Sequence, residues 1–218
     1  MSGARRAAFF DVDDTLITVK SMFRFLEHDR PPAEYRRVMA ELRALKASGL
    51  PREVTGRAFY RTLAGRDVAE VAGSGAAWFA AELDRGGLFD REVLALLRGH
   101  AGRGDLIVLV SGSFPACLDP LAAHVGAHVV LCSRPEVRRG RYTGGVAAPM
   151  IGDRKAAAVL AAAALHGLSL DASYAYGDHL SDVPLMKLVG NPVMVGDDPA
   201  LGEHALRHGW PRLARTAA

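Results

Sequence analysis

Three groups of polar residues that could form a catalytic site occur far apart in the chain, each directly after a short apolar run. Asp11 and Asp13 follow the first run, Ser111 follows the second, and Asp178 and Asp182 follow a later one. Carboxylates crowded into one site repel each other, and a hard divalent cation bound by their oxygen atoms removes that conflict. If the fold brings these residues together, they predict a Mg²⁺ site with a hydroxyl group beside it.

Lys155 adds a positive charge to this set. It lies near the start of Asp153–His166, a segment with the periodicity of a helix. An ammonium group, a hydroxyl group, a helix N-terminus and a metal ion together suit a dianion such as a phosphoryl group. These residue types therefore predict chemistry on a phosphate ester.

Each of these features is commonplace when it occurs alone. An Asp-x-Asp sequence is usually part of a solvated turn, and a lysine in the first turn of a helix is usually solvated too. The prediction depends on order and placement, because all three polar groups end strand-like runs and the lysine opens a helix.

The apolar runs have the pattern of a buried parallel sheet. Short, dense runs bounded by Gly, Asp or Ser predict strands, whereas longer stretches with three-to-four-residue periodicity predict helices. Their alternation predicts an α/β fold, in which ligands bind beyond the carboxyl ends of the strands. The three polar groups should therefore meet along one edge of the sheet. The predicted strands are Ala7–Val12, Leu106–Val110, His128–Cys132, Ser173–Tyr176 and Pro192–Val195.

The segment from about Thr18 to Leu88 breaks this alternation, because it contains only helical patterns. A block of this length is far longer than an ordinary connection between strands. We therefore expect a helical cap, residues 19–88, inserted into an α/β core made of residues 1–18 and 89–218. The segment Arg138–Gly145 predicts a small hairpin or flap. The candidate helices of the cap are Pro32–Ala47, Pro51–Leu63 and Asp67–Leu83.

The composition limits the possible partners. The chain has 218 residues, half of them hydrophobic, a net charge of +3, and only 7% aromatic residues. Its arginines are scattered, whereas a nucleic-acid site needs a basic patch with stacking aromatics, so we expect no nucleic-acid partner. No apolar run approaches the roughly 20 residues that span a bilayer, so we expect no membrane contact. Cys117 and Cys132 have no metal-like spacing and favour reduced thiols in a cytoplasmic protein.

The motifs resemble those of the haloacid dehalogenase-like hydrolases, within the branch that includes the phosphoserine phosphatases. The resemblance covers the whole chain and implies a Rossmann-like parallel sheet core with an inserted all-helical cap. Asp14 stands where Gly is frequent in the family, and His179 stands where a small residue is common. The segments similar to the four family motifs are Asp11-Val12-Asp13-Asp14-Thr15-Leu16, Ser111-Gly112-Ser113, Lys155, and Gly177-Asp178 through Asp182.

The resemblance implies a Mg²⁺-dependent phosphatase that acts on a small phosphorylated metabolite through an aspartyl-phosphate. Asp11 would attack phosphorus, and Asp13 would protonate the leaving alcohol and later activate water. Mg²⁺ would be bound by Asp11, by the backbone carbonyl of Asp13, by Asp178, and by Asp182 directly or through water. The residues that would position the phosphoryl oxygens are Ser111, Gly112 and Lys155.

Lys20 lies nine positions after Asp11, where phosphoserine phosphatases typically have an acidic residue that receives the substrate's ammonium group. Two interpretations are open: a solvated lysine at the hinge of the cap, or an ammonium group that faces the pocket. The second interpretation reverses the charge preference of the site. It predicts weak activity on phosphoserine and better activity on neutral or anionic phosphates of sugars, cyclitols or short acids.

Other functions fit part of this pattern. A phosphotransferase or mutase would use the same residues with an alcohol other than water as the acceptor, depending on how the cap seals the site. A phosphorelay receiver also uses an aspartate at a sheet edge. It places its acidic pair before the phosphoacceptor, however, and needs only about 120 residues without a helical insert. A catalytically silent binding protein would not need all six pocket side chains. The oligomeric state does not follow from the sequence.

Overall fold

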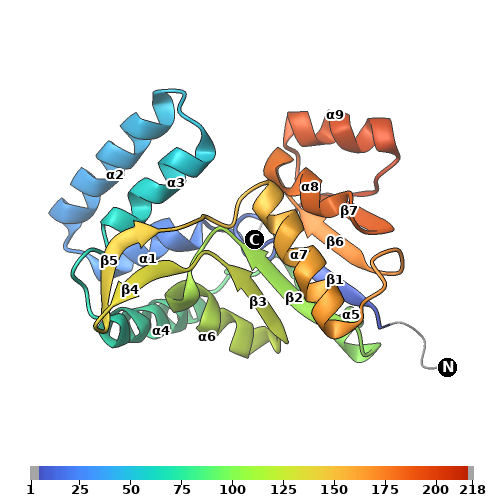
Figure 1. Ribbon diagram of the computed structural model, residues 1–218, viewed down its shortest axis with the longest axis horizontal. Helices are drawn as coiled ribbons and strands as arrows, with labels where there is room; N and C mark the ends of the chain where they lie inside the picture. The colour runs from blue at the N-terminus through green and yellow to red at the C-terminus, as the bar shows by residue number, and fades with distance from the viewer. Residues whose placement is uncertain (1–4, 216–218) are drawn as a thin grey trace.

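A computed structural model describes residues 5–215 and contains a parallel sheet with a helical block beyond one of its ends (Figure 1). The strand order is β3-β2-β1-β6-β7-β8, and all neighbouring strands in this sheet are parallel. The five predicted strands are therefore confirmed, and a short sixth strand extends the sheet. The strands are β1 (Ala7–Phe10), β2 (Leu106–Ser111), β3 (Val129–Cys132), β6 (Tyr174–Gly177), β7 (Asn191–Val195) and β8 (Arg212–Leu213).

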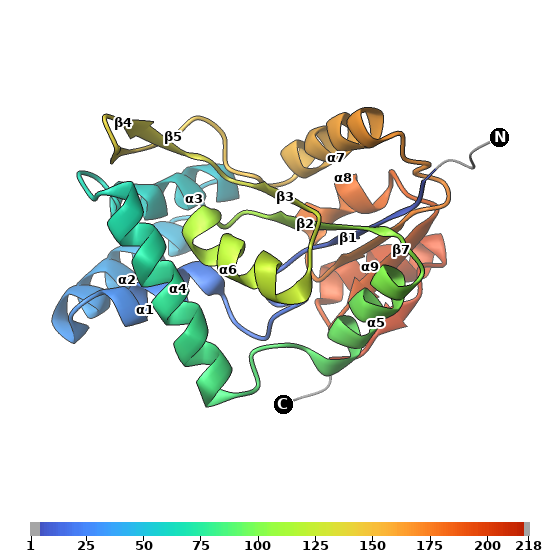
Figure 2. The same cartoon turned by 90° about the horizontal axis from the view of Figure 1, so that it is seen from below.

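Helices cover both faces of the sheet, with α7 and α8 on one face and α5 and α6 on the other (Figure 2). The β1 residues Ala7 and Phe9 pack with the α7–α8 side, and Ala8 and Phe10 pack with the other side. Because successive side chains of a strand point to opposite faces, a strand covered on both faces must be apolar throughout. The helices of the core are α5 (Arg91–Gly102), α6 (Pro115–Val125), α7 (Asp153–His166), α8 (Val183–Met186) and α9 (Pro199–His208), with a 3-10 turn at Leu180–Asp182.

The helical block consists of four helices between β1 and β2. Asp67 caps α4 by accepting hydrogen bonds from the backbone N–H groups of Ala69 and Glu70, and prolines lie in the first turn of α2 and just before α3. The predicted inserted cap is thus confirmed as a helical insert. Its exact limits, residues 19–88, stay a prediction. The helices are α1 (Ser21–Asp29), α2 (Pro32–Ala47), α3 (Arg52–Arg61) and α4 (Val68–Arg85).

The helical block is closely joined to the core through α4 and α6. A Cβ atom added at Gly75 of α4 would lie 1.9 Å from the backbone oxygen of Ala116 in α6. Only glycine allows the two helix backbones to approach this closely. The block therefore buries part of its surface against the core as well as within itself.

A small antiparallel hairpin lies against the helical block. It consists of β4 (Pro135–Arg138) and β5 (Arg141–Val146), so the predicted hairpin is present and three residues longer at its start. The Tyr142 N–H donates to the Arg66 carbonyl at 2.9 Å, and the Gly65 N–H donates to the Tyr142 carbonyl at 2.8 Å. These bonds attach the hairpin to the segment between α3 and α4. Among the described residues, no helix combines the length and apolar character needed to cross a membrane.

Candidate active site

The carboxyl ends of β1, β2 and β6 bring the three polar groups together. β1 lies between the other two strands, with Phe10 opposite Leu109 of β2 and Tyr176 of β6. The chain leaves the sheet at Asp11, whose backbone N–H still donates to the Tyr176 carbonyl at 2.9 Å. The residues that follow these strands therefore lie at one edge of the sheet, as the strand pattern predicted.

Asp11 is buried, with 6% of its surface exposed, and its carboxylate has two partners. Oδ1 forms an ion pair with the Lys155 ammonium, and Oδ2 lies 3.2 Å from the Thr15 hydroxyl. Burial is the strongest single effect and would raise the pKa of Asp11, but the charge and hydrogen bond of Lys155, with the charge of Lys20 and a Val12 backbone hydrogen bond, together hold this pKa below its usual value. Asp11 is therefore an ionised carboxylate in a site with little water, which is the state that a nucleophile requires.

Lys155 connects two carboxylates that come from different loops. It lies in the first turn of α7, it is buried, and its Nζ donates to Asp182 Oδ1 at 2.7 Å as well as to Asp11. Burial would lower the pKa of Lys155, but the charges of Asp11 and Asp182 raise it above its usual range. The lysine is therefore charged and contributes one positive charge to the site.

Asp11, Asp178 and Asp182 form an acidic group in which one carboxylate oxygen of each residue lies within 4.8 Å of the others. Thr15 Oγ1 also lies 3.3 Å from Asp178 Oδ1, so its single proton serves either Asp11 or Asp178. Burial, with repulsion from Asp11, raises the pKa of Asp178 to about 7, and burial raises the pKa of Asp182. The buried Lys155 ammonium contacts Asp11 and Asp182 but not Asp178, so the group holds three carboxylates and one buried cation.

The local backbone supports this grouping. The backbone N–H of His179 donates to Asp182 Oδ2 at 3.2 Å, which fixes the orientation of that carboxylate. A Cβ atom at Gly177 would lie 2.7 Å from Asp182 Cβ, so a side chain at the end of β6 would displace Asp182. The resulting set of oxygen donors is the type that binds a hard divalent cation.

Asp13 lies next to this acidic group, and its carboxylate is not part of it. Its Oδ1 accepts a hydrogen bond from the backbone N–H of Ser21, the first residue of α1, at 3.1 Å. Burial raises the pKa of Asp13 to about 6; the Ser21 hydrogen bond opposes this shift, and the charge of Asp11 adds to it. A carboxyl group with this pKa can give and take a proton near neutral pH. The predicted metal ligand from Asp13 is its backbone carbonyl, and that stays a prediction.

The loop after β2 is held by hydrogen bonds from both sides. The Ser111 hydroxyl accepts from the Ser113 N–H at 3.1 Å, and the Gly112 carbonyl accepts from the Tyr60 hydroxyl at 2.7 Å and from the Ser133 hydroxyl at 2.8 Å. Because Tyr60 belongs to the helical block, this loop is a point of contact between block and core. Its position beside Asp11 is consistent with the predicted phosphate-binding role of Ser111 and Gly112.

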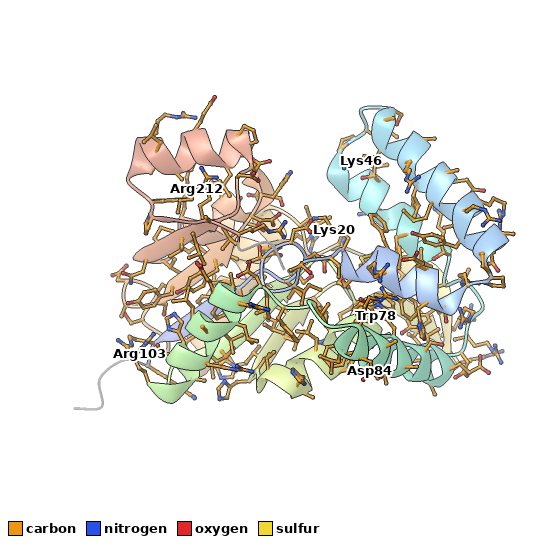
Figure 3. The ribbon with its side chains drawn as sticks, turned by 180° about the vertical axis from the view of Figure 1, so that it is seen from behind. Lys20, Lys46, Trp78, Asp84, Arg103 and Arg212 are labelled. Carbon is orange, nitrogen blue, oxygen red and sulfur yellow. The ribbon has the colours of Figure 1, made fainter. Side chains whose placement is uncertain are left out.

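Lys20 precedes α1 at the junction between the helical block and the core (Figure 3). Its ammonium group forms an ion pair with Asp14, and its charge also stabilises the carboxylates of Asp11, Asp13 and Asp178. Its side chain is 42% exposed, so it is accessible to solutes. Lys20 therefore combines features of both sequence interpretations, because it is partly solvated and yet acts on the acidic group.

Several residues that complete the site were not singled out from the sequence. Thr15 lies four positions after Asp11 in the first motif, so its place in the motif was a usable signal. Ser21 and Tyr60 come from the helical block, and no spacing relates them to the loop residues that they contact, Asp13 and Gly112. Their hydroxyl and backbone groups could only be found from the packing of block on core.

The chain matches known proteins over most of its length. The family model described as haloacid dehalogenase-like hydrolase matches residues 8–187. The Mycobacterium tuberculosis protein named probable phosphatase Rv3661 is 31% identical, over 97% of this chain and 76% of its own length. Phosphoserine phosphatase SerB1 from the same species is also 31% identical, over 97% of this chain and 73% of its own length.

A solved structure shares the complete architecture. It is a protein of unknown function from Bordetella pertussis Tohama I, 31% identical, with a TM-score of 0.85 over 96% of this chain and 98% of that chain. The family match, the phosphatase relatives and the acidic group at the sheet edge agree with one another. The chain is therefore an enzyme, a phosphatase that belongs to the haloacid dehalogenase-like hydrolases, in the branch that includes the phosphoserine phosphatases.

Proposed function

We propose that the protein is a Mg²⁺-dependent phosphomonoester hydrolase that acts on a small phosphorylated metabolite through an aspartyl-phosphate. The proposal is carried by the buried, ionised Asp11, which lies beside Lys155 in a group of three carboxylates that one lysine does not neutralise. A phosphate dianion can approach such a group only when further positive charge is present.

Mg²⁺ fits the donors of this site. Asp11, Asp178 and Asp182 offer only carboxylate oxygens, which suit a hard cation, and the Asp13 carbonyl is the further ligand that we expect. When bound, the cation would offset the excess negative charge and polarise the phosphoryl oxygens.

The chemical steps follow from the states of the two aspartates. Asp11 attacks phosphorus in line, so an O–P bond forms to its carboxylate while the bond from phosphorus to the alcohol oxygen breaks. Asp13, with a pKa of about 6, gives its proton to the leaving alcohol. Asp13 then takes a proton from water, which attacks the aspartyl-phosphate and releases inorganic phosphate and the free Asp11 carboxylate.

Lys155, Ser111 and Gly112 are proposed to bind the phosphoryl oxygens. The Lys155 ammonium already lies against Asp11, so it can balance the charge of the oxygens during attack. Ser111 and Gly112 lie in the loop that Tyr60 and Ser133 hold, which favours a fixed position for a hydroxyl and a backbone N–H donor.

We further propose that phosphoserine is a poor substrate. The charge of Lys20 acts on the carboxylates of Asp11, Asp13 and Asp178, so the ammonium group of phosphoserine would meet a like charge near the site. One relative is named a phosphoserine phosphatase. Phosphoserine is therefore the comparison substrate that tests this part of the proposal.

A phosphotransferase or mutase remains the alternative within the same family, because the proposed steps differ only in whether water or another alcohol attacks the aspartyl-phosphate. Family membership rules out the phosphorelay receiver. The cytoplasmic location stays a prediction. It is consistent with Cys117 and Cys132, which are free and buried.

The test is release of inorganic phosphate from a panel of sugar, cyclitol, amino-acid, nucleotide, glycerol and short-acid phosphates, with Mg²⁺ and with excess chelator. We expect hydrolysis that needs Mg²⁺ and is weak on phosphoserine. Undiminished hydrolysis in chelator would refute the metal-dependent mechanism. Phosphoserine turnover equal to that of the best substrate would refute the proposed role of Lys20.

A pair of lysine variants sharpens this test. Lys20→Glu should shift the preference toward phosphoserine, because it replaces a repelling charge with an attracting one. Lys46→Glu is the matched control, since Lys46 is an exposed residue at the end of α2 (Figure 3). Equal behaviour of the two variants would show that Lys20 does not act on the substrate.

A further inference from the structure

Asp14 is an unusual residue for its position in the loop after β1. Its φ angle is +64°, in the left-handed region that most non-glycine residues avoid, although Asp tolerates it better than most. Its carboxylate contacts two cations, the Lys20 ammonium and the Arg215 guanidinium. The loop therefore presents a carboxylate, where glycine would relieve the strain, at a point where two positive groups converge.

Arg215 reaches this loop from a different part of the chain. It follows β8, and its Nη2 lies 3.4 Å from Asp14 Oδ1. Its side chain runs along Gly196, the residue after β7, where an added Cβ would meet Arg215 Cδ at 3.5 Å. The core strands β7 and β8 thus position Arg215, whereas the start of α1 positions Lys20.

The side chains of Lys20, Arg215 and Asp14 are all accessible to solutes, and together they carry two positive charges and one negative charge. Lys20 is 42% exposed, Arg215 is 35% exposed and Asp14 is 23% exposed. Two cations share one carboxylate, which leaves one positive charge in excess at the surface. The buried group around Asp11 has the opposite sign, with negative charge in excess.

The two regions lie close enough to share one ligand. Asp14 is three residues after Asp11, and the charge of Lys20 acts on Asp11 and Asp178. A molecule whose phosphoryl group lies at Asp11, and whose other end lies on the Asp14 side, would meet both Lys20 and Arg215. A guanidinium and an ammonium group together match the two oxygens of a carboxylate.

We infer that Lys20 and Arg215, held together by Asp14 in the free enzyme, bind a carboxylate of the substrate, so that the preferred substrate is the phosphate ester of a short hydroxy acid. This inference rests on the proposed phosphatase function and narrows its substrate class. The substrate carboxylate replaces Asp14 as the partner of the two cations. Arg215 is then a specificity-determining residue.

The test compares two non-hydrolysable ligands in the presence of Mg²⁺. Phosphonoacetate has a carboxylate next to its phosphonate, and ethylphosphonate has a methyl group of similar size there. Isothermal titration calorimetry on the full chain should show tighter binding of phosphonoacetate. Arg215→Gln should weaken binding of phosphonoacetate about fivefold, the upper range for a partly exposed ion pair, and leave ethylphosphonate unchanged.

Two further variants separate specific recognition from general charge. Asp14→Asn keeps a residue that tolerates the left-handed backbone and frees both cations, so it should tighten phosphonoacetate binding. Arg207→Gln removes one positive charge from the exposed outer side of α9 and should change neither ligand. Tighter phosphonoacetate binding in Asp14→Asn together with weaker binding in Arg215→Gln is not the result that a general loss of stability would give.

Three results would overturn the inference: equal affinity of the two ligands in the wild type, unchanged binding in Arg215→Gln, or an equal loss in Arg207→Gln. Hydrolysis of p-nitrophenyl phosphate by the same preparation keeps the two proposals apart. If it is hydrolysed with Mg²⁺ and the ligands bind equally, only the carboxylate site is wrong. If there is no hydrolysis at all, the proposed function itself fails.

Discussion

Two largely buried clusters of ionisable side chains lie around the same pair of strands, β1 and β6, and they differ in charge balance. The first is the acidic group of Asp11, Asp178 and Asp182 beyond the strand ends. The second is a network of His100, Asp105 and Tyr176. It lies on the sheet face covered by α5, where Phe10 stacks on Tyr176 with ring centroids 4.6 Å apart.

The second network is internally satisfied. His100 Nδ1 lies 2.8 Å from Asp105 Oδ2 and His100 Nε2 lies 2.8 Å from the Tyr176 hydroxyl, while Arg6 Nε donates to Asp105 Oδ1 at 2.9 Å. A neutral imidazole with its proton on Nδ1 donates to Asp105 and accepts from Tyr176. The Arg103 guanidinium also lies at this network, with Nη2 2.9 Å from His100 Nδ1 and Nε 3.7 Å from Asp105 Oδ2. Burial lowers the pKa of His100, and burial raises the pKa of Tyr176 to about 12.

The comparison shows how a polar cluster that stabilises the fold differs from one that binds a charged ligand. Where every buried carboxylate has a cationic partner and the other polar groups are hydrogen-bonded, as in the His100 network, the cluster needs no further positive charge and contributes to stability. Where carboxylates outnumber cations, the cluster is incomplete until it binds positive charge. The acidic group is of the second kind. The predictions below test this distinction, beginning with the largest expected effect.

Asp11→Asn should reduce phosphate release by at least about 10⁴-fold, because the amide has nearly the same shape and cannot act as a nucleophile. Steady-state assays on the best substrate, with circular dichroism to confirm the fold, provide the measurement. Asp119→Asn, at an exposed position of α6, is the control and should keep full activity. Appreciable turnover by Asp11→Asn would remove Asp11 from the role of nucleophile.

Asp13→Asn should slow alkyl phosphates by about 10²–10⁴-fold, the usual contribution of general acid–base catalysis. The loss on p-nitrophenyl phosphate should be smaller, since nitrophenolate leaves without needing a proton. The measurement is the ratio of kcat values on the two substrate types. An equal loss on both would show that Asp13 does not protonate the leaving group.

The core of the fold could be predicted from sequence because its signals are local. The helix predicted at Pro32–Ala47 has the same limits in the structure, and the strand predicted at Ala7–Val12 was too long by two residues. Val12 is buried and apolar like the strand, but its carbonyl accepts from Thr15 and Ile17 within the loop. Hydrophobicity reports burial, and it does not distinguish a strand end from a buried loop.

Contacts between distant segments could not be predicted in the same way. The carboxylates could be grouped because each follows a strand and parallel strands share an edge. The contact of Arg215 with Asp14 depends on β8, a strand of two residues without a sequence pattern. The packing of Gly75 against Ala116 depends on which helix faces α4, and the periodicity of α4 does not specify its partner.

His100→Gln should destabilise the protein by about 1–3 kcal/mol at pH 8, because it leaves a buried hydrogen-bond network incomplete. It should also flatten the dependence of stability on pH. The pKa of His100 is lower in the folded state than its usual 6.5, so the unfolded chain binds the proton more readily. Stability from this residue is therefore complete above pH 6.5 and is lost as the pH falls below it.

Urea unfolding at pH 8 and pH 5.5 measures both effects. The wild type should lose more stability between these pH values than His100→Gln loses. His28→Gln, at an exposed position near the end of α1, should keep the wild-type pH dependence. An equal loss of stability between the two pH values in all three proteins would show that the His100 network does not set the acid sensitivity.

Asp178→Asn should raise the stability of the metal-free protein, opposite to His100→Gln, and its effect should be the smallest of those predicted here. Without divalent metal, the half-buried Asp178 carboxylate lies beside Asp11 and Asp182, so removing its charge relieves repulsion that the Lys155 ammonium does not balance. We expect a gain of about 1 kcal/mol, which corresponds to a rise in Tm of roughly 2–4 °C for a chain of this size. Mg²⁺ should raise the Tm of the wild type by mass action and raise that of Asp178→Asn much less, because the substitution removes a proposed metal ligand. Thermal unfolding in chelator and in Mg²⁺ gives all four values without any activity assay. A lower Tm for Asp178→Asn in chelator would mean that the acidic group is already balanced, and an equal Mg²⁺ response in both proteins would place the cation elsewhere.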